Sequence, residues 1–169
     1  IQPPTPGLAE QMRPRIHRLG ALMQELGWHL DFLTPGWLVR ELLPDLRALP
    51  VEFSVAHLGL FPAKDGPGQP GFQEFLDLVR GGRCWVKLTG VYRMSTVPGF
   101  TDVTPMARAL IAARPDRIIW GSDYPHLSFH DRVGSVGLFN KLAEWAPDAS
   151  TRERILVENP RVLFGFVSS

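Results

Sequence analysis

The stretch RIIWGSDYPH, residues 117–126, decides the fold class, because an apolar run in it ends on a carboxylate. Ile118, Ile119 and Trp120 have the apolar character of a buried strand, and Asp123 follows after a Gly-Ser pair. In parallel α/β sheets, the polar groups that carry out chemistry collect at the carboxyl ends of the strands. The stretch therefore predicts a buried parallel strand with a candidate functional side chain at its end.

The same pattern recurs toward the amino terminus. Apolar runs predict strands at residues 28–34, 51–57, 85–89 and 117–122. Helical spacing separates them, and the predicted helices lie near residues 8–26, 38–49, 72–82, 102–115, 137–146 and 150–166. Alternation of strand and helix through four units predicts a parallel sheet covered by helices. The loops that follow the strands are the long ones, rich in Gly and Pro, which places the expected working face at the carboxyl ends of the strands.

Local signals refine three of these helices. The first carries an apolar stripe at steps of three and four and ends at Gly27; the stripe consists of Leu8, Met12, Ile16, Leu19, Met23 and Leu26. The second, from about Leu38 to Leu49, is expected to break or bend at Pro44. In the last, Ser150 is the predicted N-cap, with Glu153 three residues later.

Composition narrows the class of protein. The 169 residues carry a net charge of +1 and are 44% hydrophobic, which is typical of one globular domain. No apolar run approaches the roughly 20 residues of a membrane span, and no basic tract suits a phosphate backbone. We therefore expect a soluble protein that acts on small molecules, with no nucleic-acid or membrane partner. The single Cys84, beside Trp85, predicts a packed thiol, and the absence of an export signal predicts a cytoplasmic location.

Polar residues follow three of the predicted strands. They are His57, the segment 89–93, and Asp123 with His126. A His and an Asp on one face can hold and deprotonate a water, either with Asp123 as general base or through a metal that both coordinate. Arg93 suits a substrate carboxylate, which a guanidinium binds with two parallel hydrogen bonds.

Each of these residues also has a structural interpretation. Asp123 suits a cap for the turn that follows it, His57 suits a core histidine bonded to a strand carbonyl, and Arg93 suits a solvated surface. Lys87, inside a strand, is expected to pair with a carboxylate. The spacing of His126 and His130 fits two metal ligands on one helical turn, but the neighbouring Pro125 disfavours a helix there. The sequence contains no Cys pair, Gly-x-Ser-x-Gly or P-loop motif.

Taken together, VAHLG, CWVKLTGVYRMS, IIWGSDYPH and ILVENPRVLFGF resemble the amidohydrolase-related family of (β/α)8-barrel hydrolases. The branch they resemble most is that of the 2-pyrone-4,6-dicarboxylate lactonases. The resemblance implies that the four predicted strands are strands five to eight of the barrel. Since no His-x-His motif occurs and the chain begins with Ile1, we expect it to be the carboxyl-terminal part of a barrel whose strands one to four are missing.

The resemblance also implies roles for single residues. Asp123 is the implied general base for hydrolysis of a lactone, with His57 polarising the substrate carbonyl; the same two residues are the implied ligands where a metal is present. Arg93, His126 and Tyr92 are implied to bind the substrate, a small carboxylate or lactone. The cofactor stays open between a divalent metal such as zinc and none.

Two observations keep other functions open. Lactonase-like members usually have an Arg where Leu60 stands here, which removes one expected contact to a dicarboxylate. The alternative enzyme is a metal-dependent decarboxylase of the same superfamily. A non-enzymatic alternative is a half barrel that pairs with an amino-terminal half or with a second copy, because four strands leave two open edges; a homo-oligomer is then the expected assembly.

Overall fold

The computed structural model describes residues 3–166 and contains a four-stranded sheet whose strands follow one another in chain order. All three pairings are parallel, as predicted. The strands are β1 (Leu30–Phe32), β2 (Phe53–Val55), β3 (Cys84–Leu88) and β4 (Ile118–Trp120). They are shorter than the predicted runs, because several flanking residues enter turns instead of the ladder.

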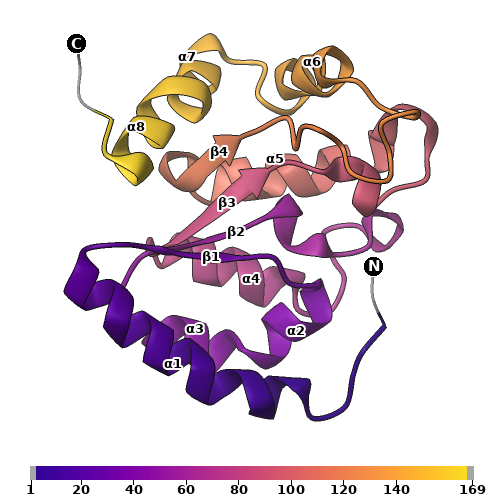
Figure 1. Cartoon of the computed structure of the whole chain (residues 1–169). Helices are drawn as coiled ribbons and strands as arrows, with labels where there is room; N and C mark the ends of the chain where they lie inside the picture. Colours follow the sequence, from indigo (N-terminus) through magenta and orange to yellow (C-terminus); the bar gives the residue numbers. More distant parts are fainter. Residues whose placement is uncertain (1–2, 167–169) are drawn as a thin grey trace.

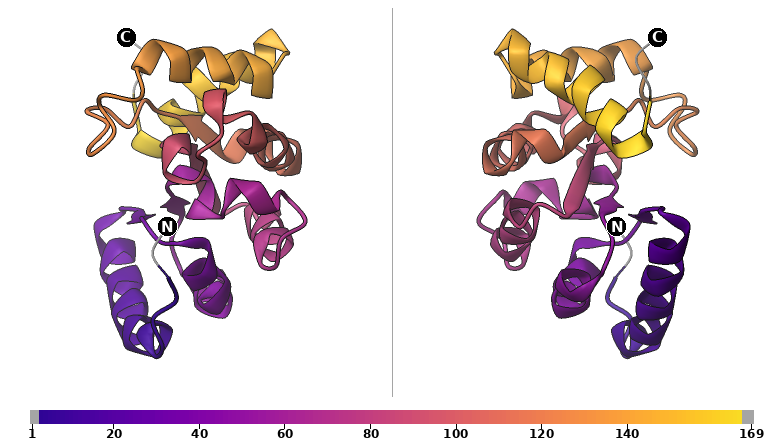
Figure 2. Two further views of the ribbon diagram at one scale, coloured as in Figure 1. Left: turned by 90° about the vertical axis from the view of Figure 1, so that its right-hand side faces the viewer. Right: turned by 90° about the vertical axis from the view of Figure 1, so that its left-hand side faces the viewer.

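The helices are α1 (Leu8–Leu26), α2 (Gly36–Glu41), α3 (Leu43–Ala48), α4 (Phe72–Arg80), α5 (Thr104–Ala113), α6 (Ser135–Trp145), α7 (Ala149–Glu153) and α8 (Asn159–Phe164). A π-helical segment, Arg154–Glu158, joins the last two. Figures 1 and 2 show α3, α4 and α5 on one face of the sheet, with α1 and α8 at its two edges. The arrangement confirms an α/β fold with a parallel sheet.

The two faces of the sheet carry different side chains, because successive residues of a strand point to opposite sides. On the helix-covered face, the strands contribute to the main core through Phe53, Val55, Cys84, Val86, Leu88 and Ile118. On the other face, Trp85 and Ile119 pack against Leu163 of α8. Cys84 is fully buried, and burial raises the pKa of its thiol, which agrees with the predicted packing role.

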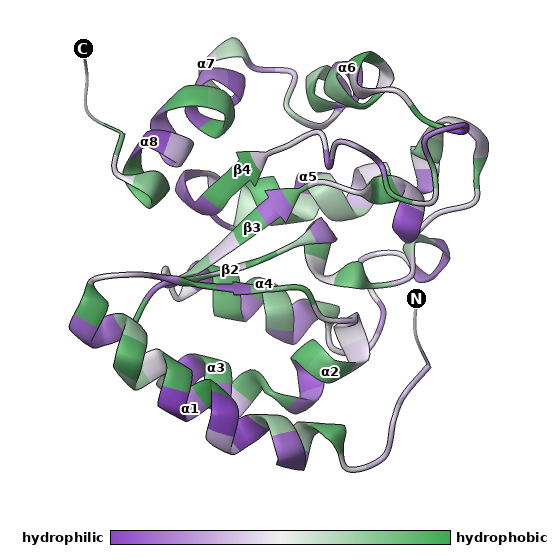
Figure 3. Cartoon of the chain, in the orientation of Figure 1, coloured by the Kyte–Doolittle hydropathy of each residue, from purple (hydrophilic) through white to green (hydrophobic). Residues whose placement is uncertain are grey.

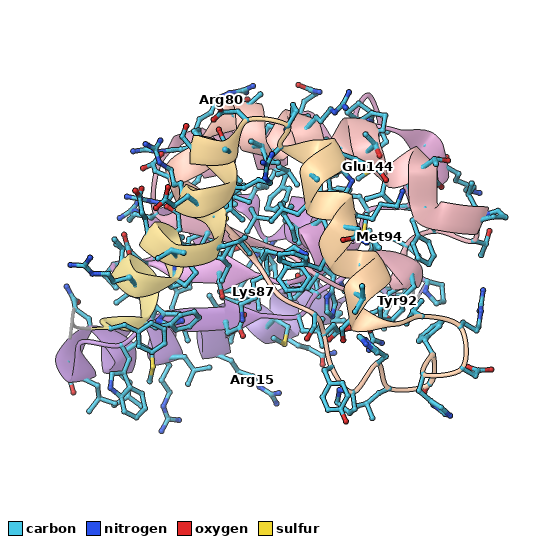
Figure 4. All side chains as sticks on the ribbon, turned by 90° about the horizontal axis from the view of Figure 1, so that it is seen from above. Arg15, Arg80, Lys87, Tyr92, Met94 and Glu144 are labelled. Carbon is cyan, nitrogen blue, oxygen red and sulfur yellow. The ribbon has the colours of Figure 1, made fainter. Side chains whose placement is uncertain are left out.

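Lys87 also belongs to this second face, where it donates a hydrogen bond to Asp31 at 2.5 Å. Ser54 donates to the other oxygen of that carboxylate at 2.7 Å. Burial alone would raise the pKa of Asp31, but the bonds from Lys87 and Ser54 outweigh it and lower the pKa. The expected carboxylate partner of Lys87 is thus confirmed, and Figure 4 shows Lys87 near the middle of the sheet.

Two local predictions need correction. The second predicted helix breaks at Leu42, and Pro44 stands at the start of α3, where its missing N–H costs no hydrogen bond. The N-cap of α7 is Asp148 and not Ser150, because the Asp148 carboxylate accepts the Thr151 N–H at 2.8 Å. Ser150 instead donates its hydroxyl to the same carboxylate.

The apolar stripe of α1 is only partly buried. The helix ends at Gly27 in a left-handed conformation, as predicted, and Ile16 packs into the core. Leu19 and Leu26, however, are about half exposed, and Figure 3 shows hydrophobic and hydrophilic residues interspersed along this helix. Within residues 3–166, no helix combines the length and apolar character needed to cross a bilayer.

Candidate active site

Three turns meet at the carboxyl ends of β2, β3 and β4. They are the 3₁₀ turn His57–Leu60, the 3₁₀ turn Val91–Arg93, and the loop from Gly121 that joins β4 to α6. Three of the predicted site residues take left-handed backbone conformations, with φ of 53° at His57, 59° at Asp123 and 58° at His126. Non-glycine residues rarely adopt such φ values and cluster at functional sites when they do.

Asp123 is the centre of the site. Its Oδ2 atom accepts a hydrogen bond from the Tyr92 hydroxyl at 2.5 Å and one from Arg93 Nε at 2.9 Å. Its Oδ1 atom accepts no hydrogen bond from residues 3–166 and lies 3.9 Å from His57 Nε2. The side chain does not cap the turn that follows, because the Tyr124 N–H donates to the Ser122 hydroxyl. One carboxylate oxygen is therefore held in place while the other faces His57.

His57 is buried, and the segment that follows β3 holds it. Its backbone N–H donates to Thr89 Oγ1 at 3.2 Å, and its ring Nδ1 lies 2.7 Å from the same oxygen. The ring thus contacts the Thr89 hydroxyl, where the structural interpretation expected a strand carbonyl. Burial lowers the pKa of His57, and a hydrogen bond with the Thr89 backbone acts against burial and raises it. It also packs on Gly90, where an added Cβ would lie 2.8 Å from Cε1 and 2.9 Å from Cγ of the ring. Only glycine leaves room for the imidazole here.

Arg93 lies at the site, but the carboxylate that it binds in this structure is that of Asp123 and not that of a substrate. Nε bonds to Asp123, and the guanidinium carbon lies 5.4 Å from the centre of the Tyr92 ring and 5.5 Å from that of Phe129. The two terminal nitrogens of the guanidinium make no hydrogen bond to the described residues. Arg93 can therefore hold Asp123 and still offer two donors to an anion.

His126 packs beneath Tyr92. Its Nδ1 lies 3.4 Å from the Tyr92 hydroxyl and its Nε2 lies 3.1 Å from the hydroxyl of Ser135, the first residue of α6. Figure 4 shows Tyr92 beside the loop after β4. His126 is only 5% exposed, and its backbone N–H donates to the Asp123 carbonyl at 2.8 Å. Its ring makes no hydrogen bond to the Asp123 carboxylate and instead supports Tyr92. His130 is exposed in the same loop, and no helix there forms the two-histidine ligand pair.

The described residues do not complete a metal site. Within residues 3–166, no group of three or more His, Cys, Asp or Glu side chains lies close enough to hold an ion. His57 and Asp123 supply two donors, whereas protein zinc sites take three or four ligands from the protein. This donor set alone therefore supports no step through a metal.

The surroundings shift three pKa values. Burial would raise the pKa of Asp123, but the hydrogen bonds from Tyr92 and Arg93 outweigh it, so the net shift is downward. Burial lowers the pKa of His57, against the opposing charge of Asp123. Burial and then Asp123 raise the pKa of Tyr92 to about 12. At neutral pH the site thus holds an ionised Asp123, a neutral His57 and a protonated Tyr92.

These shifts predict a loss of stability in acid. Because the pKa of His57 is lower in the folded protein, the unfolded chain binds a proton first as pH falls below about 6.5, and folding is disfavoured from there. Asp123 adds a second loss below about pH 3.9 for the same reason. We expect the unfolding free energy, measured by urea titration, to fall by at most about 1.4 kcal/mol per pH unit for the His57 proton. His57→Gln should remove the part that begins near pH 6.5; an unchanged pH dependence in that variant would contradict the assignment.

A hollow lined in part by Tyr92 borders the site. It has a volume of about 430 Å³ and lies between the loop after β3 and the start of α6. Its walls include Val97, Phe100 and Leu138, and its cationic side chains are Arg132 and Lys141. Lys141 is paired with Glu144 at 2.9 Å, whereas Arg132 forms no ion pair within residues 3–166. The positive charge around Tyr92 favours an anionic ligand.

Comparison with known proteins agrees with the arrangement. The family profile described as amidohydrolase matches residues 2–166. A 4-sulfomuconolactone hydrolase of Hydrogenophaga intermedia is 39% identical over 148 residues, which are 85% of this chain and 49% of the relative. A 2-pyrone-4,6-dicarboxylate hydrolase of Comamonas testosteroni is 29% identical, over 90% of this chain and 53% of the relative.

A solved structure from Pseudomonas putida, named provisionally as a 2-pyrone-4,6-dicarboxylic acid hydrolase, superposes with a TM-score of 0.81. It is 30% identical, and the match covers 98% of this chain and 61% of that one. The chain thus spans about half the length of the curated relatives that it matches.

Sequence reasoning found most of this site but missed two residues. It named His57, Tyr92, Arg93, Asp123 and His126, which lie together here. It gave no role to Thr89 and did not mention Ser135, the two hydroxyls that contact the histidine rings. The sequence did offer a reason to consider Thr89, because it is a polar residue at the end of an apolar strand. The sequence offered no such reason for Ser135, since no local pattern indicates that it contacts His126.

Proposed function

The chain belongs to the amidohydrolase family, and on that premise we propose that it opens an anionic lactone by hydrolysis, with Asp123 as the general base. One observation carries the proposal: Tyr92 and Arg93 hold Asp123 Oδ2 while Oδ1 stays open toward His57 Nε2, 3.9 Å away. A carboxylate fixed in this way is a positioned acceptor for a proton of water.

The proposed reaction uses these residues in order. Asp123 Oδ1 takes a proton from water as the water oxygen bonds to the lactone carbonyl carbon, and His57 hydrogen-bonds the carbonyl oxygen as negative charge develops on it. The ring C–O bond then breaks, and the proton on Asp123 passes to the departing oxygen. The products are a hydroxyl group and a carboxylic acid in one open chain, and the acid releases its proton to solvent to become a carboxylate.

The anionic substrate class rests on charge. The terminal nitrogens of Arg93, whose guanidinium lies over the Tyr92 ring, have no carboxylate partner among the described residues. Neither does the guanidinium of Arg132, which lines the hollow beside Tyr92. The relatives are named for lactones that carry a sulfonate or carboxylates. Leu60 stands where the family resemblance implies an Arg, which favours a substrate with fewer anionic groups.

We also propose that the four strands correspond to strands five to eight of a (β/α)8 barrel. The parallel pairing in chain order supports this placement, since each strand of such a barrel pairs with the next. The proposal includes a site completed by other strands of the same barrel, which is where any further metal ligand would lie.

The function is tested by substrate comparison. We expect the protein to hydrolyse 4-sulfomuconolactone or 2-pyrone-4,6-dicarboxylate with a kcat/KM at least about tenfold above that for an uncharged lactone of the same ring size, because one charged contact is worth about 1.5–3 kcal/mol. Ring opening is followed by loss of ring absorbance and by acid release. Release of carbon dioxide from a carboxylated substrate with the ring intact would favour the decarboxylase instead. Equal turnover of charged and uncharged lactones would contradict the anionic class.

A further inference from the structure

The hydroxyl of Thr89 makes two contacts with one residue, His57. It accepts the His57 backbone N–H at 3.2 Å, and it lies 2.7 Å from the ring Nδ1. A threonine hydroxyl has one proton to donate and two lone pairs with which to accept. Whether the hydroxyl donates to Nδ1 or accepts from it decides which nitrogen of the neutral imidazole carries the proton. A ring nitrogen that accepts a hydrogen bond carries no proton, so the proton is then on the other nitrogen.

Two independent contacts favour the same tautomer. If Nδ1 carried the proton, Thr89 Oγ1 would accept twice and its own proton would have no acceptor within residues 3–166. If Nδ1 is the acceptor, the Thr89 hydroxyl donates its proton to Nδ1, and a lone pair of Oγ1 still accepts the His57 backbone N–H. At the other end of the ring, Nε2 faces Asp123 Oδ1 at 3.9 Å; an N–H there attracts the ionised carboxylate, whereas a lone pair repels it.

We propose that Thr89 is a positioning residue that holds His57 as the Nε2–H tautomer. The inference rests on the proposed function, in which His57 acts on the substrate carbonyl. A protonated Nε2 is a hydrogen-bond donor, so it suits polarisation of that oxygen. It has no lone pair to give to a metal, which separates the two roles that the sequence left open for His57.

Gly90 and Gly121 make this contact possible. Gly90 takes a φ of 56° and leaves the space that the ring occupies. At Gly121, an added Cβ would lie 3.0 Å from the Thr89 methyl group. Gly90 therefore leaves room for the His57 ring, and Gly121 leaves room for the Thr89 side chain that presents its hydroxyl to it.

The test is a long-range ¹H–¹⁵N NMR correlation on protein labelled with ¹⁵N-histidine, recorded at neutral pH, with the His57 signals assigned by their loss in His57→Gln. We expect the wild-type protein and Thr89→Ser, which keeps the hydroxyl, to show a protonated Nε2 and an unprotonated Nδ1. Thr89→Val has nearly the same shape but no hydroxyl, so it should lose this single tautomer. Its kcat should fall about 10- to 100-fold, the scale seen at metal sites when the hydrogen-bond partner that fixes a histidine tautomer is removed, with little change in KM.

The outcomes separate this inference from the proposed function. A wild-type spectrum with a protonated Nδ1 overturns the inference, even where Asp123 proves essential for lactone hydrolysis. So does Thr89→Val with the wild-type tautomer and unchanged kcat. If the tautomer behaves as expected but no lactone is hydrolysed, the proposed function fails and the Thr89 contact stands. If Thr89→Val does not fold, the wild-type and Thr89→Ser spectra still decide the tautomer.

Discussion

Asp123→Asn is expected to lower kcat for lactone hydrolysis by at least about 10²-fold, which is the usual contribution of a general base. An asparagine has nearly the same shape, and its carbonyl oxygen can still accept the hydrogen bonds from Tyr92 or Arg93. It cannot take a proton from water, because the amide is far less basic than a carboxylate. The loss should therefore appear in kcat with KM largely preserved, as expected when an interaction of the transition state is removed.

The matched control is Asp131→Asn. Asp131 lies in the same loop between β4 and α6, is exposed, and is absent from the site. This variant makes the same change of charge, so its kcat should stay close to the wild-type value. Thermal unfolding of both variants shows whether the fold is retained. A kcat of Asp123→Asn equal to that of Asp131→Asn would remove Asp123 from the role of base.

Gly90→Ala is expected to cause the largest loss of stability among the variants considered. The residue has a left-handed φ of 56°, which costs a residue with a Cβ about 1–2 kcal/mol. The new methyl group would also overlap the buried His57 ring, and overpacking of this kind costs about 1–3 kcal/mol more. The unfolding free energy should fall by roughly 2–5 kcal/mol in total. Since relief of the overlap moves the His57 ring, kcat should fall as well.

Gly27→Ala separates the two causes. Gly27, which ends α1, has nearly the same backbone conformation as Gly90 (φ 66° and ψ 29°, against φ 56° and ψ 32°), but nothing lies within 4 Å of the added Cβ. This variant should lose only the backbone part, about 1–2 kcal/mol, and keep its activity. Urea denaturation of the two variants gives the comparison. Equal losses at both positions would show that the His57 ring has room for a methyl group and that Gly90 is needed only for its backbone conformation.

The fold was largely predictable from local patterns. Four apolar runs separated by helical spacing predict a parallel sheet, since both the runs and the helices are properties of neighbouring residues. The errors lie where two local signals compete. Asp148 and Ser150 are both good N-cap residues, and the carboxylate accepts the Thr151 N–H while the serine hydroxyl donates to it. The exposure of Leu19 could not be read from the α1 stripe, because periodicity describes one helix and not what covers it.

The sequence by itself determined which residues reach the site, because the carboxyl ends of parallel strands meet at one edge, and His57, Arg93 and Asp123 each follow such a strand. Only the tertiary structure decided which role each of these residues has in the site. Left-handed turns at His57 and Asp123 set the directions of their side chains, and these directions depend on contacts between strands far apart in the chain. Those contacts bring Thr89 to His57, Tyr92 and Arg93 to one oxygen of Asp123, and Ser135 to His126. Hydrogen bonds of this kind require distances of about 3 Å, which residue types and spacing alone do not specify.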